Sequence, residues 1–357
     1  MVGALTPTWE TFFTSWLRLG SYPTSGMPRH ASWWMRPNKR LLLPPKKWSK
    51  RYALVHRRAA QQNRESVSPR QSDGQEFQVV SKKYIPDVDS VLARRHDNGA
   101  DYWASADGRL AVGEPFSTLT SLLILHELKV ARTHEAICGA LELIRGARRD
   151  DGRYRLAPSG TLYPCSTAAA ARVLSRFGEA RDHRLQQTLI HLLETQHDDG
   201  GWRCNKFSYG RGPETEFSNP GVTLSVLDIY RFTEHVNKNP SLDRAVESLL
   251  DHWVVRRPIG PCHFGIGTLF MQVEYPFLRY NLFYYVYVLS FYDRAKGDQR
   301  YLEALRVLES KLDARSRVVV ERPNRKLADL SFCAAGRPSD LATARYREIV
   351  KNLNLER

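Results

Sequence analysis

Hydrophobic residues along this chain follow two helical patterns. Residues 242–254 carry an apolar stripe whose members are spaced three and four apart, as expected for a helix with one buried face. Residues 281–292 are apolar on nearly every side, so a helix there has to be buried on every side. Only the short run at 317–320 alternates at every second residue. The chain is therefore predicted to be all-α.

The two kinds of helix occur in turn. Apolar helices are expected at 116–128, 166–177, 223–232 and 280–292, and charged amphipathic helices at 134–148, 185–196, 242–254 and 301–312. Asp-Gly turns at 107–110, 151–154 and 199–202 recur at intervals of 44 and 48 residues, long enough for a helical hairpin. No such turn occurs near 256–262. Apolar helices inside and charged helices outside predict a single closed double ring, an α/α toroid.

One segment carries a family resemblance. In residues 189–202, Gln196, Gly200 and Trp202 match the Q-x3-G-x-W element that marks the repeats of squalene-hopene cyclases, which share the α/α toroid with protein prenyltransferase β-subunits. Three further strings resemble bacterial prenyltransferase-like toroid proteins, at 97–103, 260–292 and 321–333. The resemblance covers about residues 95–350. It implies a transferase or cyclase that acts on an apolar or isoprenoid-like substrate in a central cavity.

The catalytic motifs of both families are missing. Cyclases use an Asp-x-Asp-Asp acid, and the nearest sequence here, Asp-Val-Asp-Ser at 87–90, is expected to cap a helix N-terminus. No Asp-x-Cys pair precedes an inner helix, as the zinc site of a protein prenyltransferase would require. The chain is about half a cyclase, which leaves room for one ring. The resemblance thus implies the fold and leaves the reaction open.

Three cysteines lie at equivalent positions in successive helical repeats. Cys165, Cys204 and Cys262 all lie where loops enter the apolar helices, and His263 follows directly. Thiolate and imidazole are favoured zinc ligands, so these four residues are predicted to bind Zn²⁺. The alternative is that the cysteines are small buried hydrophobes. The odd total of five widely spaced cysteines indicates reduced thiols and a cytoplasmic protein.

Three residues are candidate acid or base groups. His263 and Glu216 lie in the loops before apolar helices, and Glu274 is flanked by apolar residues, where a carboxylate's pKa is often perturbed. For Glu216 the alternative is a solvated loop position. For Glu274 it is an ion pair with Arg279 or another arginine.

An aromatic stripe is the candidate substrate-binding surface. Tyr280, Tyr284 and Tyr287 recur along one face of the expected helix at 280–292, near Arg279. Aromatic faces stabilise carbocations, and a guanidinium binds diphosphate. The alternative is that the stripe is ordinary core.

Charge divides the chain in two. Of the net charge of +15, residues 1–80 hold +9, from 13 Lys and Arg against 4 Asp and Glu. We expect a basic, irregular extension over 1–80, or a mis-assigned start, and a toroid domain over 81–357. A basic tail does not by itself indicate specific nucleic-acid binding. The apolar run at 273–292 is interrupted by polar residues, so a buried helix is expected there and no transmembrane segment.

Three functions remain open from the sequence. The first is an enzyme acting on an apolar or isoprenoid-like substrate, assisted by zinc. The second is a non-catalytic toroid that binds a ligand or protein partner and holds a structural Cys/His metal site. The third, an α/α-barrel hydrolase or lyase of saccharides, lacks the expected number of cavity acids and Trp platforms.

Overall fold

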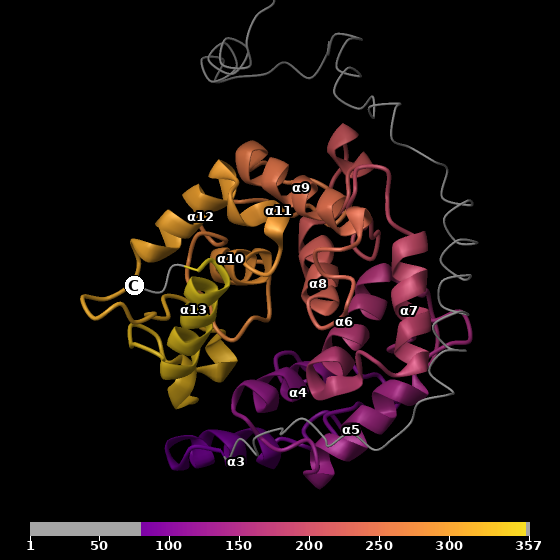
Figure 1. Ribbon diagram of the computed structural model, residues 1–357. Coiled ribbons are helices and arrows are strands. Elements are labelled where there is room, and N and C mark those ends of the chain that lie inside the picture. The colour runs from indigo at the N-terminus through magenta and orange to yellow at the C-terminus, as the bar shows by residue number, and fades with distance from the viewer. Residues whose placement is uncertain (1–79, 355–357) are drawn as a thin grey trace, which may run out of the picture. The chain divides into compact units, whose positions relative to one another are not determined.

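The computed structural model describes residues 80–354 (Figure 1). Four apolar helices are present, α4 (Thr118–Glu127), α6 (Pro164–Leu174), α8 (Pro220–Tyr230) and α10 (Leu282–Leu289). Each is followed by an amphipathic helix: α5 (Glu135–Gly146), α7 (His183–Glu194), α9 (Pro240–Val255) and α12 (Gln299–Glu309). All eight predicted helices are thus found.

Shorter elements and the terminal helices complete the described chain. They are η2 (Lys82–Tyr84), α3 (Ile85–Ala93), η3 (Ser175–Glu179), η4 (Pro213–Glu216), α11 (Asp293–Lys296), η5 (Arg325–Leu327), η6 (Ser331–Cys333) and α13 (Asp340–Asn352). Between residues 80 and 354, extended pairing is limited to isolated bridges, so the all-α prediction is confirmed for this part of the chain. The extension predicted over 1–80 lies outside the described residues, apart from Val80.

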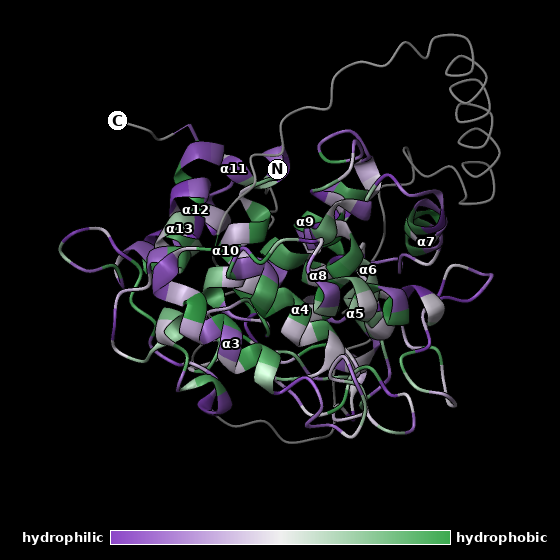
Figure 2. Cartoon of the chain, turned by 90° about the horizontal axis from the view of Figure 1, so that it is seen from below, coloured by the Kyte–Doolittle hydropathy of each residue, from purple (hydrophilic) through white to green (hydrophobic). Residues whose placement is uncertain are grey.

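The helices form two layers. The apolar helices α4, α6, α8 and α10 contact one another in chain order, and α5, α7, α9 and α12 each pack on the apolar helix that precedes them (Figure 1). Every residue of α10 is buried, whereas α12 buries one stripe. Hydrophilic residues gather on α11, α12 and the peripheral loops (Figure 2). None of the helices within 80–354 is both long and apolar enough to cross a bilayer.

The first and last described helices are joined by polar contacts. Arg345 of α13 donates to Glu127 of α4 at 2.9 Å, and Lys83 pairs with Asp340 at 2.6 Å. Asp87, expected to cap its own helix, instead accepts hydrogen bonds from the backbone of η6, including 2.8 Å from the Ser331 N–H. That expectation is wrong: Asp87 lies inside α3, and its carboxylate binds the amides of a segment far along the chain.

The Gln-Gly-Trp element links successive outer helices. Trp202 donates its indole N–H to Leu192 O of α7 at 2.7 Å, and Gln196 donates its side-chain amide to Ser241 O of α9, also at 2.7 Å. Gly200 has a φ of +91° and lies so close to α9 that a Cβ would be 2.6 Å from the Arg244 carbonyl oxygen. The motif therefore serves packing between repeats.

This close approach predicts the effect of one methyl group. Gly200→Ala is expected to lower the free energy of unfolding by about 1–2 kcal/mol, because alanine is strained at positive φ and its Cβ meets backbone. Urea denaturation measures the change. Gly297→Ala is the matched control, since a Cβ there meets nothing within 4 Å and φ is −99°. Equal stabilities of the two variants would contradict the packing role.

A turn occupies the place where the sequence shows no Asp-Gly signal. Ile259 and Phe264 form an isolated bridge, and Gly260 supplies the left-handed residue with φ +75°. A Cβ on Gly260 would lie 2.8 Å from the Ser218 carbonyl oxygen, so only glycine lets this turn approach the start of α8. The following residues, which include Cys262, are thereby brought to the N-terminal ends of the inner helices.

Candidate metal centre

Three cysteines from separate segments meet at the N-terminal ends of α6 and α8. Cys165 is the second residue of α6, Cys204 follows the Trp202 turn, and Cys262 lies in the turn after α9. The thiols of Cys165 and Cys262 both act on the pKa of Cys204, so the three side chains lie near one another. The Cys262 thiol also donates to the Cys204 carbonyl oxygen at 3.2 Å. The structure therefore brings together the three predicted thiol ligands, which we call the thiol cluster.

Glycines allow this assembly. A Cβ on Gly201 would lie 2.5 Å from Thr223 Oγ1 and 2.6 Å from Ser218 Cβ, so the loop that carries Cys204 reaches α8 only because residue 201 has no side chain. Pro164 starts α6 and places Cys165 in its first turn. A helix N-terminus favours negative charge, which suits a thiolate.

Hydrogen-bond donors surround the sulfurs. Hydrogen bonds from the Cys165 thiol and from the backbone N–H groups of Lys206 and Cys165 lower the pKa of Cys204 to about 6, against the effect of its burial. The same contact with Cys204, together with burial, raises the pKa of Cys165. Of these two thiols, Cys204 is therefore the one that loses its proton first.

Asn219 supports the thiol cluster through the backbone of Cys204. Its side chain is fully buried, and its Oδ1 accepts the Cys204 N–H at 2.8 Å. Its Nδ2 is buried without a hydrogen-bond partner among the described residues. The Asn219 amide lowers the pKa of Cys262, which burial raises. A buried amide that holds the backbone of a predicted ligand is the kind of outer support that metal ligands commonly have.

His263 is not shown beside the thiols. It is exposed and has a φ of +60°. Within the described chain, no three His, Cys, Asp or Glu side chains are already arranged as a bound metal ion requires. The role of His263 as a fourth ligand therefore stays a prediction.

The predicted acid and base residues lie in ordinary ion-pair settings. Glu274 is buried and pairs with Arg279 at 3.0 Å, which is the alternative expected from the sequence. Burial raises the pKa of Glu274, and Arg279 and Arg322 oppose this shift. Glu216 is exposed, with Arg203 3.9 Å away.

The tyrosine stripe is engaged inside the domain. Tyr284 donates to Asp228 at 2.9 Å and Tyr287 to Glu348 at 2.6 Å, and both rings are buried. The Tyr280 hydroxyl lies 3.0 Å from His252 Nδ1. Buried in this way, Tyr284 and Tyr287 present almost no surface to a ligand in this conformation.

A buried ionic network was missed by the sequence reasoning. Asp228 of α8 accepts hydrogen bonds from Tyr284 and from three guanidinium groups, those of Arg172, Arg176 and Arg231. Burial alone would raise the pKa of Asp228, but the arginines hold this pKa well below its usual range. The available signal was the spacing of Arg172 and Arg176, four residues apart on an otherwise apolar helix.

The network extends to α4. Glu127 accepts hydrogen bonds from Arg176 at 3.0 Å, Arg345 at 2.9 Å and the Tyr275 hydroxyl at 2.5 Å. Burial opposes its ionisation, yet the two guanidinium groups keep the pKa of Glu127 below its usual range. Glu127 and Asp228 are therefore ionised and paired, the opposite of the protonated acid that alkene protonation needs.

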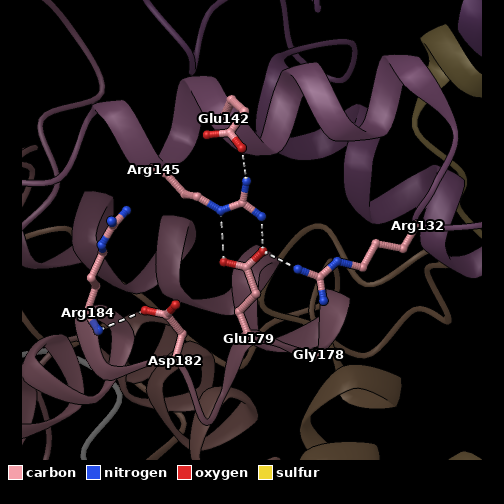
Figure 3. Close-up of a pocket in the computed structure, with 7 residues that line it drawn as sticks. All are labelled: Arg132, Glu142, Arg145, Gly178, Glu179, Asp182 and Arg184. Atoms are coloured by element: carbon pink, nitrogen blue, oxygen red, sulfur yellow. Dashed lines mark hydrogen bonds and ion pairs between the residues drawn. The ribbon is translucent and has the colours of Figure 1, made fainter.

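A surface hollow of about 460 Å³ lies between α5 and the start of α7 (Figure 3). Its lining residues are Arg132, Glu142, Arg145, Gly178, Glu179, Asp182 and Arg184. Glu179 is nearly buried and pairs with both Arg132 and Arg145. Three arginines and three acids line the hollow, so its formal charges sum to zero.

Comparison with known proteins adds no further constraint on the site. No protein-family model matches the chain, and no curated protein matches it significantly.

Proposed function

We propose that the described domain is a single-ring α/α toroid of the kind shared by terpenoid cyclases and protein prenyltransferases. The alternation of buried and amphipathic helices supports this proposal, as does the order of helix contacts from α4 to α10. The ion pairs of Arg345 with Glu127 and of Asp340 with Lys83 support closure, because they join α13 to α4 and to η2.

We propose further that the thiol cluster binds zinc. Thiolate sulfur is a preferred zinc ligand, and the meeting of three thiols from three distant segments carries the proposal. The N–H donors that face Cys204 fit a thiolate, and the buried Asn219 amide fits outer support for it. Zinc would draw the sulfurs around one point by rotation of their side chains, since they do not yet surround one.

The role proposed for this centre is binding, with the metal as a structural clip. It would fasten the loop at 203–217 to the start of α6 and to the turn after α9. That loop presents Phe207 and Tyr209, whose rings stack 5.5 Å apart and are 48% and 65% exposed. Large exposed aromatic side chains are typical of contact surfaces, so a protein partner is the proposed occupant.

The expectation of an isoprenoid enzyme with a central cavity stays a prediction. It requires accessible aromatic faces, and Tyr284 and Tyr287 are buried in the described conformation. It would also require a rearrangement of the ionic network, because Asp228 and Glu127 have no free proton to give.

Metal analysis of the reduced full-length chain tests the proposal. We expect one zinc per chain and an affinity at least about 100-fold lower for Cys204→Ser, which removes the sulfur shared by the other two. Cys138→Ser is the matched control, because Cys138 is an exposed thiol outside the cluster whose sulfur donates to the Arg132 carbonyl oxygen at 3.3 Å. Equal zinc content in wild type and Cys204→Ser, or none in wild type, would overturn the proposal.

A further inference from the structure

The loop at 203–217 exposes a pair of aromatic rings that is flanked in sequence by two cations. The Phe207 and Tyr209 rings are nearly parallel, with an angle of 7° between their planes. The Lys206 ammonium lies 5.6 Å from the centroid of the Phe207 ring, and Arg211 follows two residues after Tyr209. All four residues are exposed. We call Lys206, Phe207, Tyr209 and Arg211 the basic aromatic patch.

Backbone hydrogen bonds hold this loop in place. The Tyr209 N–H donates to the Pro261 carbonyl oxygen at 3.0 Å, and the Gly260 N–H donates to the Glu214 carbonyl oxygen at 2.8 Å. The loop is thus fastened on both sides of the aromatic pair to the turn after α9. Rings carried on a backbone that is already ordered lose less conformational entropy when a partner binds them.

The cations of the patch have no acid beside them. Among the described residues, no carboxylate lies within ion-pair distance of Lys206 or Arg211. The two acids of the loop make other contacts: Glu214 accepts two backbone N–H groups of its own loop, at 3.1 and 3.0 Å, and Glu216 lies 3.9 Å from Arg203. Two positive charges therefore stand next to apolar rings, and an acidic group is their electrostatic complement.

The charges and rings also decide between the occupants that could cover the patch. In a two-fold dimer that buried this patch against itself, its cations would repel one another. Residues 1–80 carry a net charge of +9, so the same repulsion applies to them. Nucleic-acid sites use many phosphate contacts and open aromatic faces, whereas this patch has two cations, and its rings cover one face of each other. An acidic protein segment fits best.

We propose that the basic aromatic patch binds an acidic segment of a partner protein. An apolar side chain of that segment would lie on Tyr209, and its carboxylates would lie beside Lys206 and Arg211. Aromatic and arginine side chains contribute most of the binding energy in many protein interfaces, and charges at the rim select the partner. The proposal rests on the binding role proposed above for this loop, and it does not depend on the metal, because backbone contacts position the rings.

Fluorescence anisotropy with two labelled peptides tests the proposal. One peptide is built from glutamate and phenylalanine, and its counterpart has glutamine in place of each glutamate. At low ionic strength we expect the full-length chain to bind the acidic peptide at least about tenfold more tightly than the glutamine peptide. In about 1 M salt, where the Debye length is about 3 Å, this preference is expected to disappear. No saturable binding of the acidic peptide, or equal binding of the two peptides, would overturn the proposal.

Two variants locate the binding on the patch. Tyr209→Ala and Arg211→Glu are each expected to weaken binding of the acidic peptide by about tenfold. Ile190→Ala is the control for the first, because Ile190 is 41% exposed on α7. Lys351→Glu is the control for the second, because Lys351 is exposed on α13 and its reversal changes the net charge by the same amount. Equal weakening by Arg211→Glu and Lys351→Glu would show that only the net charge matters and would overturn the patch.

Other occupants would give different results. Tighter binding of a single-stranded oligonucleotide than of the acidic peptide, lost in Tyr209→Ala, would make nucleic acid the occupant and overturn the proposal. Self-association of the chain that Tyr209→Ala abolishes would make a second copy the occupant and overturn it as well.

Zinc content separates this proposal from the metal site. Wild type, Tyr209→Ala and Arg211→Glu are expected to hold the same amount of zinc, because neither substitution removes a cysteine. Zinc in a chain that does not bind the acidic peptide would refute the acidic partner and leave the metal site. Peptide binding by a chain without zinc would refute the metal site and leave the acidic partner.

Discussion

Replacing Asp228 by alanine is expected to lower the free energy of unfolding by about 3–5 kcal/mol. The carboxylate is fully buried and accepts from three guanidinium groups and from Tyr284. Removing it leaves Arg172 and Arg176 buried without their shared counter-ion. The loss of stability is large mainly because the arginine charges stay buried without a partner. The lost attraction between Asp228 and the arginines contributes less.

Urea denaturation of two variants and a control measures this effect. Asp228→Asn keeps the shape of the side chain and loses its charge, so it is expected to show most of the loss even if Asp228→Ala does not fold. Asp293→Ala is the control, because its ion pair with Lys296, at 2.8 Å, is exposed and contributes less than about 1 kcal/mol. A loss below about 1 kcal/mol in Asp228→Asn would show that the arginines find other partners.

The order of the helices was predictable because a buried helix face appears in the sequence as a periodic pattern of apolar residues. Stripes such as that of α9 and the all-apolar sequence of α10 follow from how many faces each helix buries. Helix ends were less predictable. The last inner helix was expected over 280–292 and spans Leu282–Leu289, because the Asn281 side chain caps it by accepting the Tyr284 N–H at 3.0 Å. A cap is a single local hydrogen bond, which periodicity does not report.

The helical repeat was enough to predict which cysteines lie close together. Cys165, Cys204 and Cys262 occupy equivalent places where loops enter inner helices, so a repeated architecture brings them together. The repeat pattern does not give the direction of a side chain, and His263, next to Cys262, is exposed. Asn219 was missed for the same reason.

The ionic network was not predictable from any one segment. Asp228 and Arg176 lie 52 residues apart, and Arg345 and Glu127 lie 218 apart. Each charge taken alone resembles an exposed position on its helix. Only the assembled helices show that the charges are buried and paired with one another.

Acidification from pH 7 to pH 5 is expected to lower the free energy of unfolding by about 2 kcal/mol through His252 alone. Burial lowers the pKa of His252 from 6.5 to about 4, against hydrogen bonds to the carbonyls of Arg257 and Phe264. In the unfolded chain His252 takes up its proton near 6.5, so between these values the unfolded state binds more protons. The contribution is present in full above pH 6.5 and falls as the pH drops toward 4.

The geometry explains why His252 stays neutral. Its Nε2–H donates to the Arg257 carbonyl oxygen at 3.1 Å, which leaves Nδ1 to accept the Tyr280 hydroxyl proton at 3.0 Å. Protonation of Nδ1 would break that acceptance in a buried setting. His126 adds to the same trend, because burial and Arg176 lower its pKa to about 3.

Urea denaturation at pH 7, 6 and 5 checks this prediction. The glutamine of His252→Gln cannot titrate. Between pH 7 and pH 5 the free energy of unfolding of this variant is therefore expected to fall by about 2 kcal/mol less than that of wild type. The slope that remains in this variant belongs to His126 and the other groups. His183→Gln is the matched control, since the His183 side chain is 78% exposed. If wild type and His252→Gln lost stability in parallel, His252 would be protonated in the folded state. Its two nitrogens would then both donate, and Tyr280 would have to accept from His252 and lose its own acceptor.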